Sequence, residues 1–272
     1  MYPTIVRIGS FDITSFGVLV ALAFLVAGAV LRREGARLAL PPSLPDRLLV
    51  AAIVGGLVGA KLYYLGLYWP ATVANPLRAV INRGGQVWYG GFIGATIAIL
   101  VTLRRARQSI MPVADACAPA LALGYSIGRL GCFFVGDDYG RPTTLPWGVR
   151  FPAGPTPSTA ANLRADFGVS IPGDIPGDTV LAVHPTQLYE AALMGLAFLV
   201  LWRWRSDPRL TGRLFGLYLV LAGGERFLIE GLRAKDDRLL GSFTVAQALS
   251  VIALLVGLAW LRTGRLSRRA AA

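Results

Sequence analysis

The sequence predicts an all-α integral membrane protein with seven transmembrane helices and a small external head domain. Three observations support this fold class. The chain of 272 residues is 54% hydrophobic and only 15% charged, and its mean hydropathy of +0.57 is high for a globular protein in water. Seven apolar runs approach the length of roughly 18 or more residues that a helix needs to cross a bilayer. One long polar segment interrupts them.

The apolar runs are expected to be the membrane helices. The third and fifth are short, and the second and fourth contain glycine and polar residues. The runs cover residues about 14–31, 48–69, 87–103, 113–134, 186–202, 214–230 and 243–261.

The polar segment divides the chain into three expected parts. Residues 1–134 would contain helices 1–4, residues 135–184 an external head or lid, and residues 185–272 helices 5–7 with a basic cytoplasmic tail. The middle part is rich in Pro, Gly, Asp and Thr, and a connection of this length is usually functional. Its WGVRF stretch predicts a short strand, and the rest is expected to form turns.

The distribution of positive charge explains the net charge of +12 and predicts the topology. With the N-terminus outside, the short segments on the cytoplasmic side hold 15 of the 27 Lys and Arg residues, and the much longer external segments hold nine. This is the positive-inside asymmetry of membrane proteins. It places the C-terminus in the cytoplasm and excludes nucleic acid as the reason for the basicity.

The remaining three basic residues, Lys61, Arg129 and Arg226, fall within or beside apolar runs and need an explanation. The two cysteines, Cys117 and Cys132, lie in the fourth run, where they are typical of small buried hydrophobic residues. No spacing typical of a metal site occurs, and we expect no metal.

The first polar cluster is GRLGCFFVGDDYGR, residues 128–141, whose helix also carries Asp115. An arginine within the bilayer is costly and usually marks a functional site. Arg129 could instead snorkel to the interface and pair with Asp137 or Asp138.

The second cluster is ERFLIEGLR, residues 225–233. Arg226, Glu230 and Arg233 are spaced four and three apart, so they would share one helical face. They form either part of a functional site or a surface ladder of ion pairs.

Two further clusters lie at predicted external helix starts. In RGGQVWYGGFIG, paired glycines flank Tyr89, which could belong to an interfacial aromatic belt or contact a headgroup. In LAVHPTQLYE, the only histidine, His184, could cap a helix that begins near Pro185, with Gln187 and Glu190 on one face. Simple helix-start chemistry is the alternative there.

Together, arginines, carboxylates, a tyrosine and a histidine at one membrane depth favour a lipid phosphate over an ion path. Arginine stays charged, and its planar fork of donors matches phosphate geometry. The residues alone therefore indicate an enzyme or binder that acts on phospholipid headgroups at the outer face.

At these clusters the sequence resembles the prolipoprotein diacylglyceryl transferase family, seven-helix enzymes of the bacterial inner membrane. GRLGCFFVGDDYGR is similar to the family signature G-R-x-G-N-F-x-N-x-E-x-x-G-R, and HPTQLYE to its H-P-x-Q-L-Y-E element. RGGQVWYGGFIG and RFLIEGLR resemble its glycine turn and its R-x-x-x-E-x-x-R run, in the same order. Members transfer diacylglyceryl from phosphatidylglycerol to the lipobox cysteine of a prolipoprotein and release glycerol phosphate.

The resemblance implies roles for individual residues and no cofactor. Arg129 and Arg226 match arginines thought to hold the phosphate, and they would act in catalysis with Tyr89. The implied partners are phosphatidylglycerol, the prolipoprotein signal peptide with its lipobox cysteine, and membrane lipids. The further phospholipid-binding residues would be Arg233, Glu230, Asp137 and Gly140, and the supporting residues Asp115, His184, Gln187 and Glu190.

Several positions depart from the family pattern, among them Phe16 and Ala222, where some members have tyrosines. Tyr89 stands where the family has a histidine proposed as general base, and Cys132 replaces the signature asparagine. These changes leave two alternatives open: a paralogue that binds headgroups without catalysis, and a transferase with a different nucleophile or lipid. A transporter is disfavoured, because the polar residues gather on one side and no paired broken helices occur in matching halves.

Overall fold

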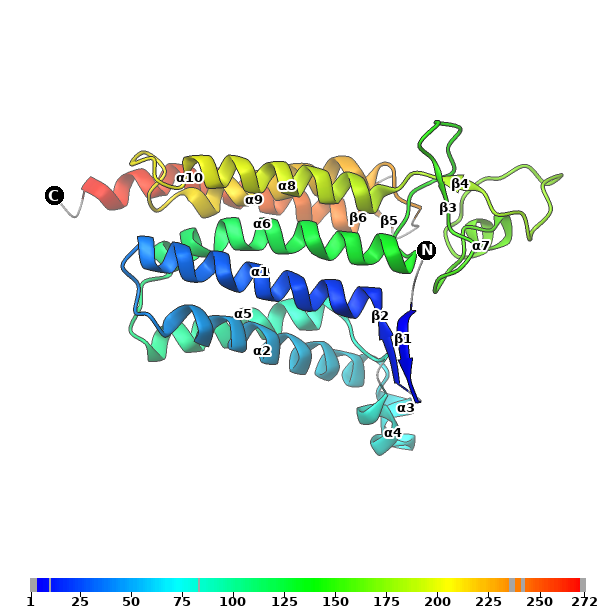
Figure 1. Cartoon of the computed structure of the whole chain (residues 1–272), viewed down its shortest axis with the longest axis horizontal. Helices are drawn as coiled ribbons and strands as arrows, with labels where there is room; N and C mark the ends of the chain where they lie inside the picture. The colour runs from blue at the N-terminus through cyan, green and yellow to red at the C-terminus, as the bar shows by residue number, and fades with distance from the viewer. Residues whose placement is uncertain (1–3, 10, 83, 235–237, 241–242, 270–272) are drawn as a thin grey trace. The chain divides into compact units, whose positions relative to one another are not determined.

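The computed structural model describes residues 4–9, 11–82, 84–234, 238–240 and 243–269. The chain forms two compact units: residues 1–30 with 114–272, and residues 31–113. Each predicted apolar run overlaps a helix of the described structure (Figure 1). These helices are α1 (Ser15–Arg37), α2 (Leu44–Leu67), α5 (Trp88–Arg105), α6 (Ile110–Val135), α8 (Thr186–Trp204), α9 (Leu214–Glu230) and α10 (Val245–Arg269).

Four of these helices are long and apolar enough to cross a membrane: α1, α2, α6 and the 245–263 part of α10. The described part of the chain is therefore mostly helical and contains four candidate membrane spans. Helices α5, α8 and α9 have 18, 19 and 17 residues, at the lower end of the range that spans a bilayer.

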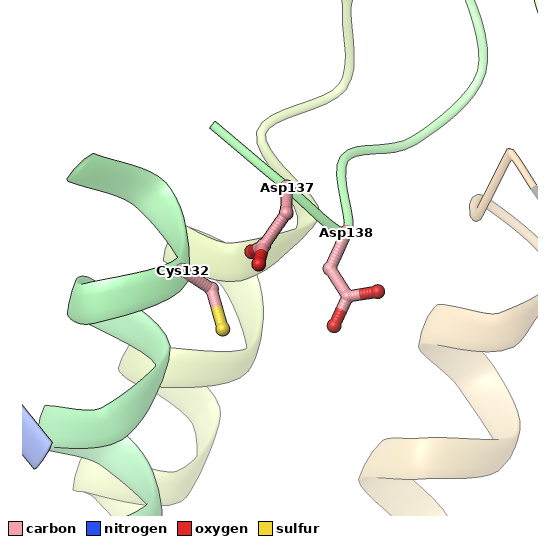
Figure 2. A group of neighbouring side chains, drawn as sticks. All are labelled: Cys132, Asp137 and Asp138. Carbon is pink, nitrogen blue, oxygen red and sulfur yellow. The ribbon is translucent and has the colours of Figure 1, made fainter. Parts of the chain in front are cut away.

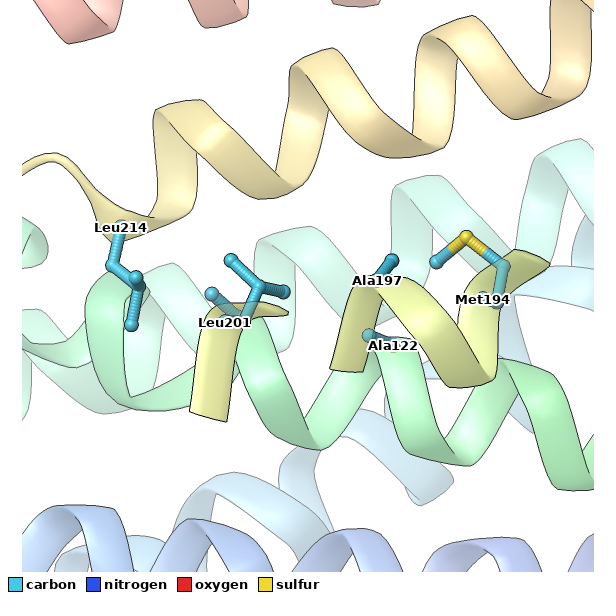
Figure 3. Packing of buried hydrophobic residues seen from close by; sticks show 6 residues of the cluster. Ala122, Met194, Ala197, Leu201 and Leu214 are labelled. Atoms are coloured by element: carbon cyan, nitrogen blue, oxygen red, sulfur yellow. The ribbon is translucent and has the colours of Figure 1, made fainter. Parts of the chain in front are cut away.

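The first unit is built on α6, α8 and α9, which share one apolar core (Figure 3). Small side chains such as Ala118 and Ala122 of α6 pack there with larger side chains of α8 and α9. The core residues are Ala118, Ala122, Met194, Ala197, Leu201 and Leu214. Helix α10 packs along α9.

The second unit pairs α2 with α5. A Cβ atom at Gly94 would overlap the carbonyl oxygen of Gly55, so glycine is needed for this close backbone contact. The unit also contains the short helices α3 (Trp69–Ala74) and α4 (Pro76–Ile81). Lys61, one of the basic residues without an explanation from sequence, donates from Nζ to the carbonyl oxygen of Asn82 at 2.6 Å.

The short strands form three antiparallel pairs in the first unit. β1 (Thr4–Ile8) pairs with β2 (Phe11–Thr14) before α1. β3 (Val149–Arg150) pairs with β4 (Ala182–Val183) within residues 135–184, which we call the head segment. β5 (Arg238–Leu240) pairs with β6 (Phe243–Thr244) before α10. Residues 270–272 of the predicted basic tail lie outside the described residues.

The head segment is more ordered than the sequence predicted. The WGVRF strand is confirmed as β3, but the expectation that the rest forms turns is wrong, because α7 (Ala160–Ala165) and β4 are also present. Thr159 begins α7, since its side chain accepts a hydrogen bond from the backbone N–H of Asn162. A small core of Tyr139, Phe151, Leu163, Val183 and Ala234 holds the segment together.

Candidate functional site

Three arginines from two distant parts of the chain converge on one buried carboxylate, Glu190 of α8. Arg129 of α6 places Nε 2.8 Å from Oε2 of Glu190, and Arg226 of α9 places Nη1 3.1 Å from Oε1. Arg233, just after α9, lies 3.7 Å from Oε1 through Nη1. The Glu190 side chain is fully buried. A buried carboxylate requires such pairing.

Two more carboxylates complete this arginine cluster. Asp138 accepts hydrogen bonds from Arg129 Nη1 at 2.9 Å and Arg233 Nη2 at 2.5 Å. Glu230 Oε2 lies 2.6 Å from Nη2 of Arg226. The cluster therefore holds three arginines and three carboxylates, whose formal charges balance.

The ion pairs decide between the interpretations of the second polar motif. The side chains of Glu230 and Arg233 are 1% and 6% exposed, and that of Arg226 is 24% exposed. The surface-ladder alternative is therefore wrong. The three residues do meet as the spacing predicted, although Arg233 follows the last residue of α9.

The start of α8 holds the cluster in place. Thr186 Oγ1 donates to the carbonyl oxygen of Asp138 at 2.8 Å, and Gln187 Nε2 donates to that of Asp137 at 2.5 Å. Both donors are fully buried. Asp138 has a φ of 59°, in the left-handed region that non-glycine residues seldom adopt. The anchored turn thus directs the Asp138 carboxylate between two arginines.

Gly140 lies where the chain passes closest to its neighbours. Its N–H donates to the carbonyl oxygen of His184 at 2.8 Å, and it forms a β-bridge with Arg233. An added Cβ would lie 2.5 Å from the carbonyl oxygen of Leu232. Glycine is required here for packing, and it holds Arg233 at the site.

His184 does not cap α8, contrary to one expectation from the sequence. The helix begins at Thr186, Pro185 occupies the cap position, and no side chain caps it. His184 Nδ1 instead lies 3.3 Å from the hydroxyl of Tyr189, which accepts a hydrogen bond from Trp147 Nε1 at 2.8 Å. Burial lowers the pKa of His184.

Asp115 lies away from the arginine cluster, although it shares α6 with Arg129. The 14 residues between them correspond to about 21 Å along a helix. Its carboxylate accepts hydrogen bonds from the backbone N–H groups of Gly212 at 2.5 Å and Phe215 at 3.1 Å. Asp115 therefore stabilises the start of α9.

Tyr89 belongs to the second unit, at the start of α5. Its side chain is 41% exposed and meets the ring of Trp88 edge to face, with centroids 5.4 Å apart. Its part in the chemistry stays a prediction.

Cys132, Asp137 and Asp138 bring their ligand atoms within 4.8 Å of one another, a grouping that no sequence motif indicated (Figure 2). Burial and the Asp138 charge raise the pKa of Asp137 to about 6. Burial alone would raise the pKa of Asp138, but Arg233 and Arg129 lower it to about 2. Both carboxylate oxygens of Asp138 already accept hydrogen bonds from Arg129 and Arg233, so we assign no metal here.

Two residues of this site were not singled out from the sequence. Tyr125 lies four residues before Arg129 on α6, and its hydroxyl accepts a hydrogen bond from Arg129 Nε at 3.1 Å. The i, i+4 spacing of the two residues could have indicated this contact. Glu225 is 7% exposed and interacts electrostatically with Glu190 and Arg129. Its Oε1 has no hydrogen-bond partner among the described residues.

The whole chain is similar in sequence to one family of known proteins. A model of the family described as prolipoprotein diacylglyceryl transferase matches residues 3–263. The phosphatidylglycerol–prolipoprotein diacylglyceryl transferase of Trichormus variabilis is 34% identical over 269 residues, which cover 95% of this chain and 89% of the relative.

Relatives with the same name from two other bacteria agree. The Nostoc sp. protein is 35% identical and covers 95% of this chain and 89% of its own length. The Geobacter sulfurreducens protein is 32% identical and covers 94% of this chain and 92% of its own length. The resemblance predicted from the four motifs is confirmed: the chain belongs to the prolipoprotein diacylglyceryl transferase family of membrane enzymes.

Proposed function

We propose that this protein transfers the diacylglyceryl group of phosphatidylglycerol to the lipobox cysteine thiol of a prolipoprotein and releases glycerol phosphate. The observation that carries the proposal is the convergence of Arg129, Arg226 and Arg233 on Glu190. Family membership supplies the reaction, and this cluster supplies the donors that a phosphate would need.

The arginines can hold carboxylates and a phosphate together. A guanidinium carries five N–H donors in a rigid fork, and the contacts of Arg129 to Glu190 and Asp138 involve only Nε and Nη1. Because the formal charges of the cluster balance, a phosphate would be recognised by directed N–H groups more than by net positive charge. Arg129 and Arg226 remain 15% and 24% exposed, and they are the most accessible of the three arginines.

The reaction is a displacement at carbon. The substrate thiolate attacks the glycerol carbon that is esterified to phosphate, a carbon–sulfur bond forms, and the carbon–oxygen bond to phosphate breaks. Arg129 and Arg226 would stabilise the charge that moves onto the departing glycerol phosphate. Tyr89 would orient the thiol or phosphate by hydrogen bonding through its phenolic hydroxyl.

The membrane arrangement is part of the proposal. All seven helices would span the bacterial inner membrane, with the N-terminus outside and the C-terminus in the cytoplasm. Helices 1–4 would belong to residues 1–134, the external head to residues 135–184, and helices 5–7 with the basic tail to residues 185–272. The excess of Lys and Arg in the short cytoplasmic segments supports this orientation.

The direct test incubates purified protein in detergent with phosphatidylglycerol and a lipobox peptide. Peptide mass and released glycerol phosphate are followed together. We expect diacylglyceryl addition to the cysteine, lost in Arg129→Ala and retained in Arg104→Ala, which removes an exposed arginine at the end of α5.

Lipid binding without turnover would contradict the transferase proposal and would favour the non-catalytic paralogue suggested by Tyr89 and Cys132. Tyr89→His would then separate the two explanations. If this variant gained turnover with a dependence on an ionisation near pH 6.5, the missing imidazole would be the cause.

A further inference from the structure

A cleft of about 970 Å³ opens in the head segment, outside the apolar helices. Its walls come from three stretches: residues 141–150, 167–175 and 181–182. This volume is at the upper end of the usual range for ligand pockets. None of the residue roles described above uses the cleft.

The lining combines apolar and cationic side chains. Arg141 and Arg150 contribute two positive charges, and no Asp or Glu is among the lining residues. The apolar part consists of Leu145, Phe167, Val169, Ile171, Ile175 and Leu181. An occupant should therefore offer both apolar contact and negative charge.

One wall of the cleft is fixed by a side chain behind it. Arg164 of α7 donates from Nη2 to the carbonyl oxygens of Pro172 at 2.5 Å and Ile175 at 3.0 Å. Its Nε also donates to the carbonyl oxygen of Ile171 at 3.4 Å. Several apolar lining residues pack on the head core, so the surface is preformed.

The other wall is joined directly to the arginine cluster. The N–H of Arg141 donates to the carbonyl oxygen of Leu232 at 2.8 Å, and its Nε donates to that of Arg233 at 3.3 Å. Its own carbonyl oxygen accepts from the N–H of His184 at 3.0 Å. Arg141 of the cleft wall is thus hydrogen-bonded to the segment that carries Arg233.

We propose that the cleft binds the stretch of prolipoprotein that follows the acceptor cysteine, as an extended polypeptide carrying a carboxylate side chain. The inference rests on the proposed function. The sulfur must reach the arginine cluster while the exported part of the substrate continues away from the membrane helices. At about 3.3 Å per residue, the next few residues extend along the wall, where Arg141 and Arg150 favour an acidic side chain.

The test uses two lipobox peptides that differ only in Asp or Asn at the third position after the cysteine. Binding to the purified protein is measured by fluorescence anisotropy, so this arm does not depend on turnover. Arg150→Gln should weaken the binding of the Asp peptide about threefold, because a partly exposed ion pair contributes little. The affinity for the Asn peptide should stay the same. Arg150→Glu should make the protein bind the Asn peptide more tightly than the Asp peptide.

The control is Arg78→Gln, an exposed arginine of α4 that does not line the cleft. This variant should bind both peptides with the same affinity as the unaltered protein. In the transfer assay, Arg150→Gln should raise the KM for the Asp peptide with the same kcat and the same KM for phosphatidylglycerol.

Equal effects on both peptides, or a change in the KM for phosphatidylglycerol alone, would overturn the inference. The second result would assign the cleft to the lipid headgroup or its released glycerol phosphate. Selective peptide binding without any transfer by the unaltered protein would instead retain the cleft and reject the proposed function.

Discussion

Arg129 and Glu190 join α6 to α8 through a contact of 2.8 Å between Nε and Oε2. The glutamate side chain is fully buried and also contacts Arg226 and Arg233. Glu190 is therefore the shared counterion of three arginines, and its removal affects all of them.

Glu190→Gln should strongly destabilise the protein. The substitution removes the negative charge that the three arginines share in a buried site. Breaking a buried ion pair lowers the free energy of unfolding by about 3–5 kcal/mol. Thermal unfolding in detergent measures this effect. The matched control is Asp46→Asn, which breaks an exposed pair with Arg32 and should cost at most about 1 kcal/mol. Similar losses in the two variants would show that Glu190 is not a shared counterion.

Arg129→Lys should not preserve transfer activity. Lysine keeps the charge but loses the planar fork that contacts Glu190 and Asp138 together. We expect kcat/KM to fall by about 100-fold or more, the typical effect of removing a preorganised donor. Circular dichroism should confirm that the variant keeps its helices. Activity within threefold of the unaltered protein would mean that only the point charge matters.

Asp137→Asn should stabilise the protein at pH 8 and have little effect at pH 4. The pKa of Asp137 is raised to about 6, above the value of about 3.9 in an unfolded chain. The stability that its protonated form contributes is present below pH 4 and is lost as the pH rises through 6. Since the site is partly exposed, the gain at pH 8 should be about 1–2 kcal/mol.

Asp138→Asn is the control, because its effect on stability at pH 8 should be opposite to that of Asp137→Asn. The pKa of Asp138 is lowered to about 2, so its ionised form contributes stability above pH 4 that is lost as the pH falls towards 2. This variant should destabilise the protein at pH 8. If the two substitutions changed the melting temperature in the same direction, the assigned environments would be wrong.

Gly140→Ala should destabilise the protein by about 1–3 kcal/mol, the usual cost of overpacking. The new methyl group would contact the Leu232 carbonyl, His184 and Thr186, none of which can move without disturbing the site. Gly66→Ala on α2 is the control, since nothing lies within 4 Å of the position that a Cβ atom would take there. It should stabilise its helix by about 0.5–1 kcal/mol. Equal melting temperatures for the two variants would contradict the packing argument.

Much of the helical framework could be predicted because the evidence for it is local. An apolar run such as 214–230 identifies a helix within one stretch of sequence, and α9 has these same bounds. The spacing of Arg226 and Glu230 likewise predicted their contact. The motifs identified the family for the same reason, since each is contiguous in the chain.

Other relationships depend on segments far apart in the sequence. No spacing indicated that Asp138 would join Arg129 to Arg233, because this requires a left-handed residue anchored by Thr186 and a bridge from Gly140. The separation of Asp115 from the cluster also required the fold, since its partners are backbone groups near the start of α9.

The sequence by itself determined the helices and the family, because local hydropathy and contiguous motifs encode them. Only the tertiary structure decided that Arg129, Arg226 and Arg233 share Glu190 and that the head segment forms a cleft. Those features depend on packing between distant segments, where burial makes an unpaired charge too costly to leave in place.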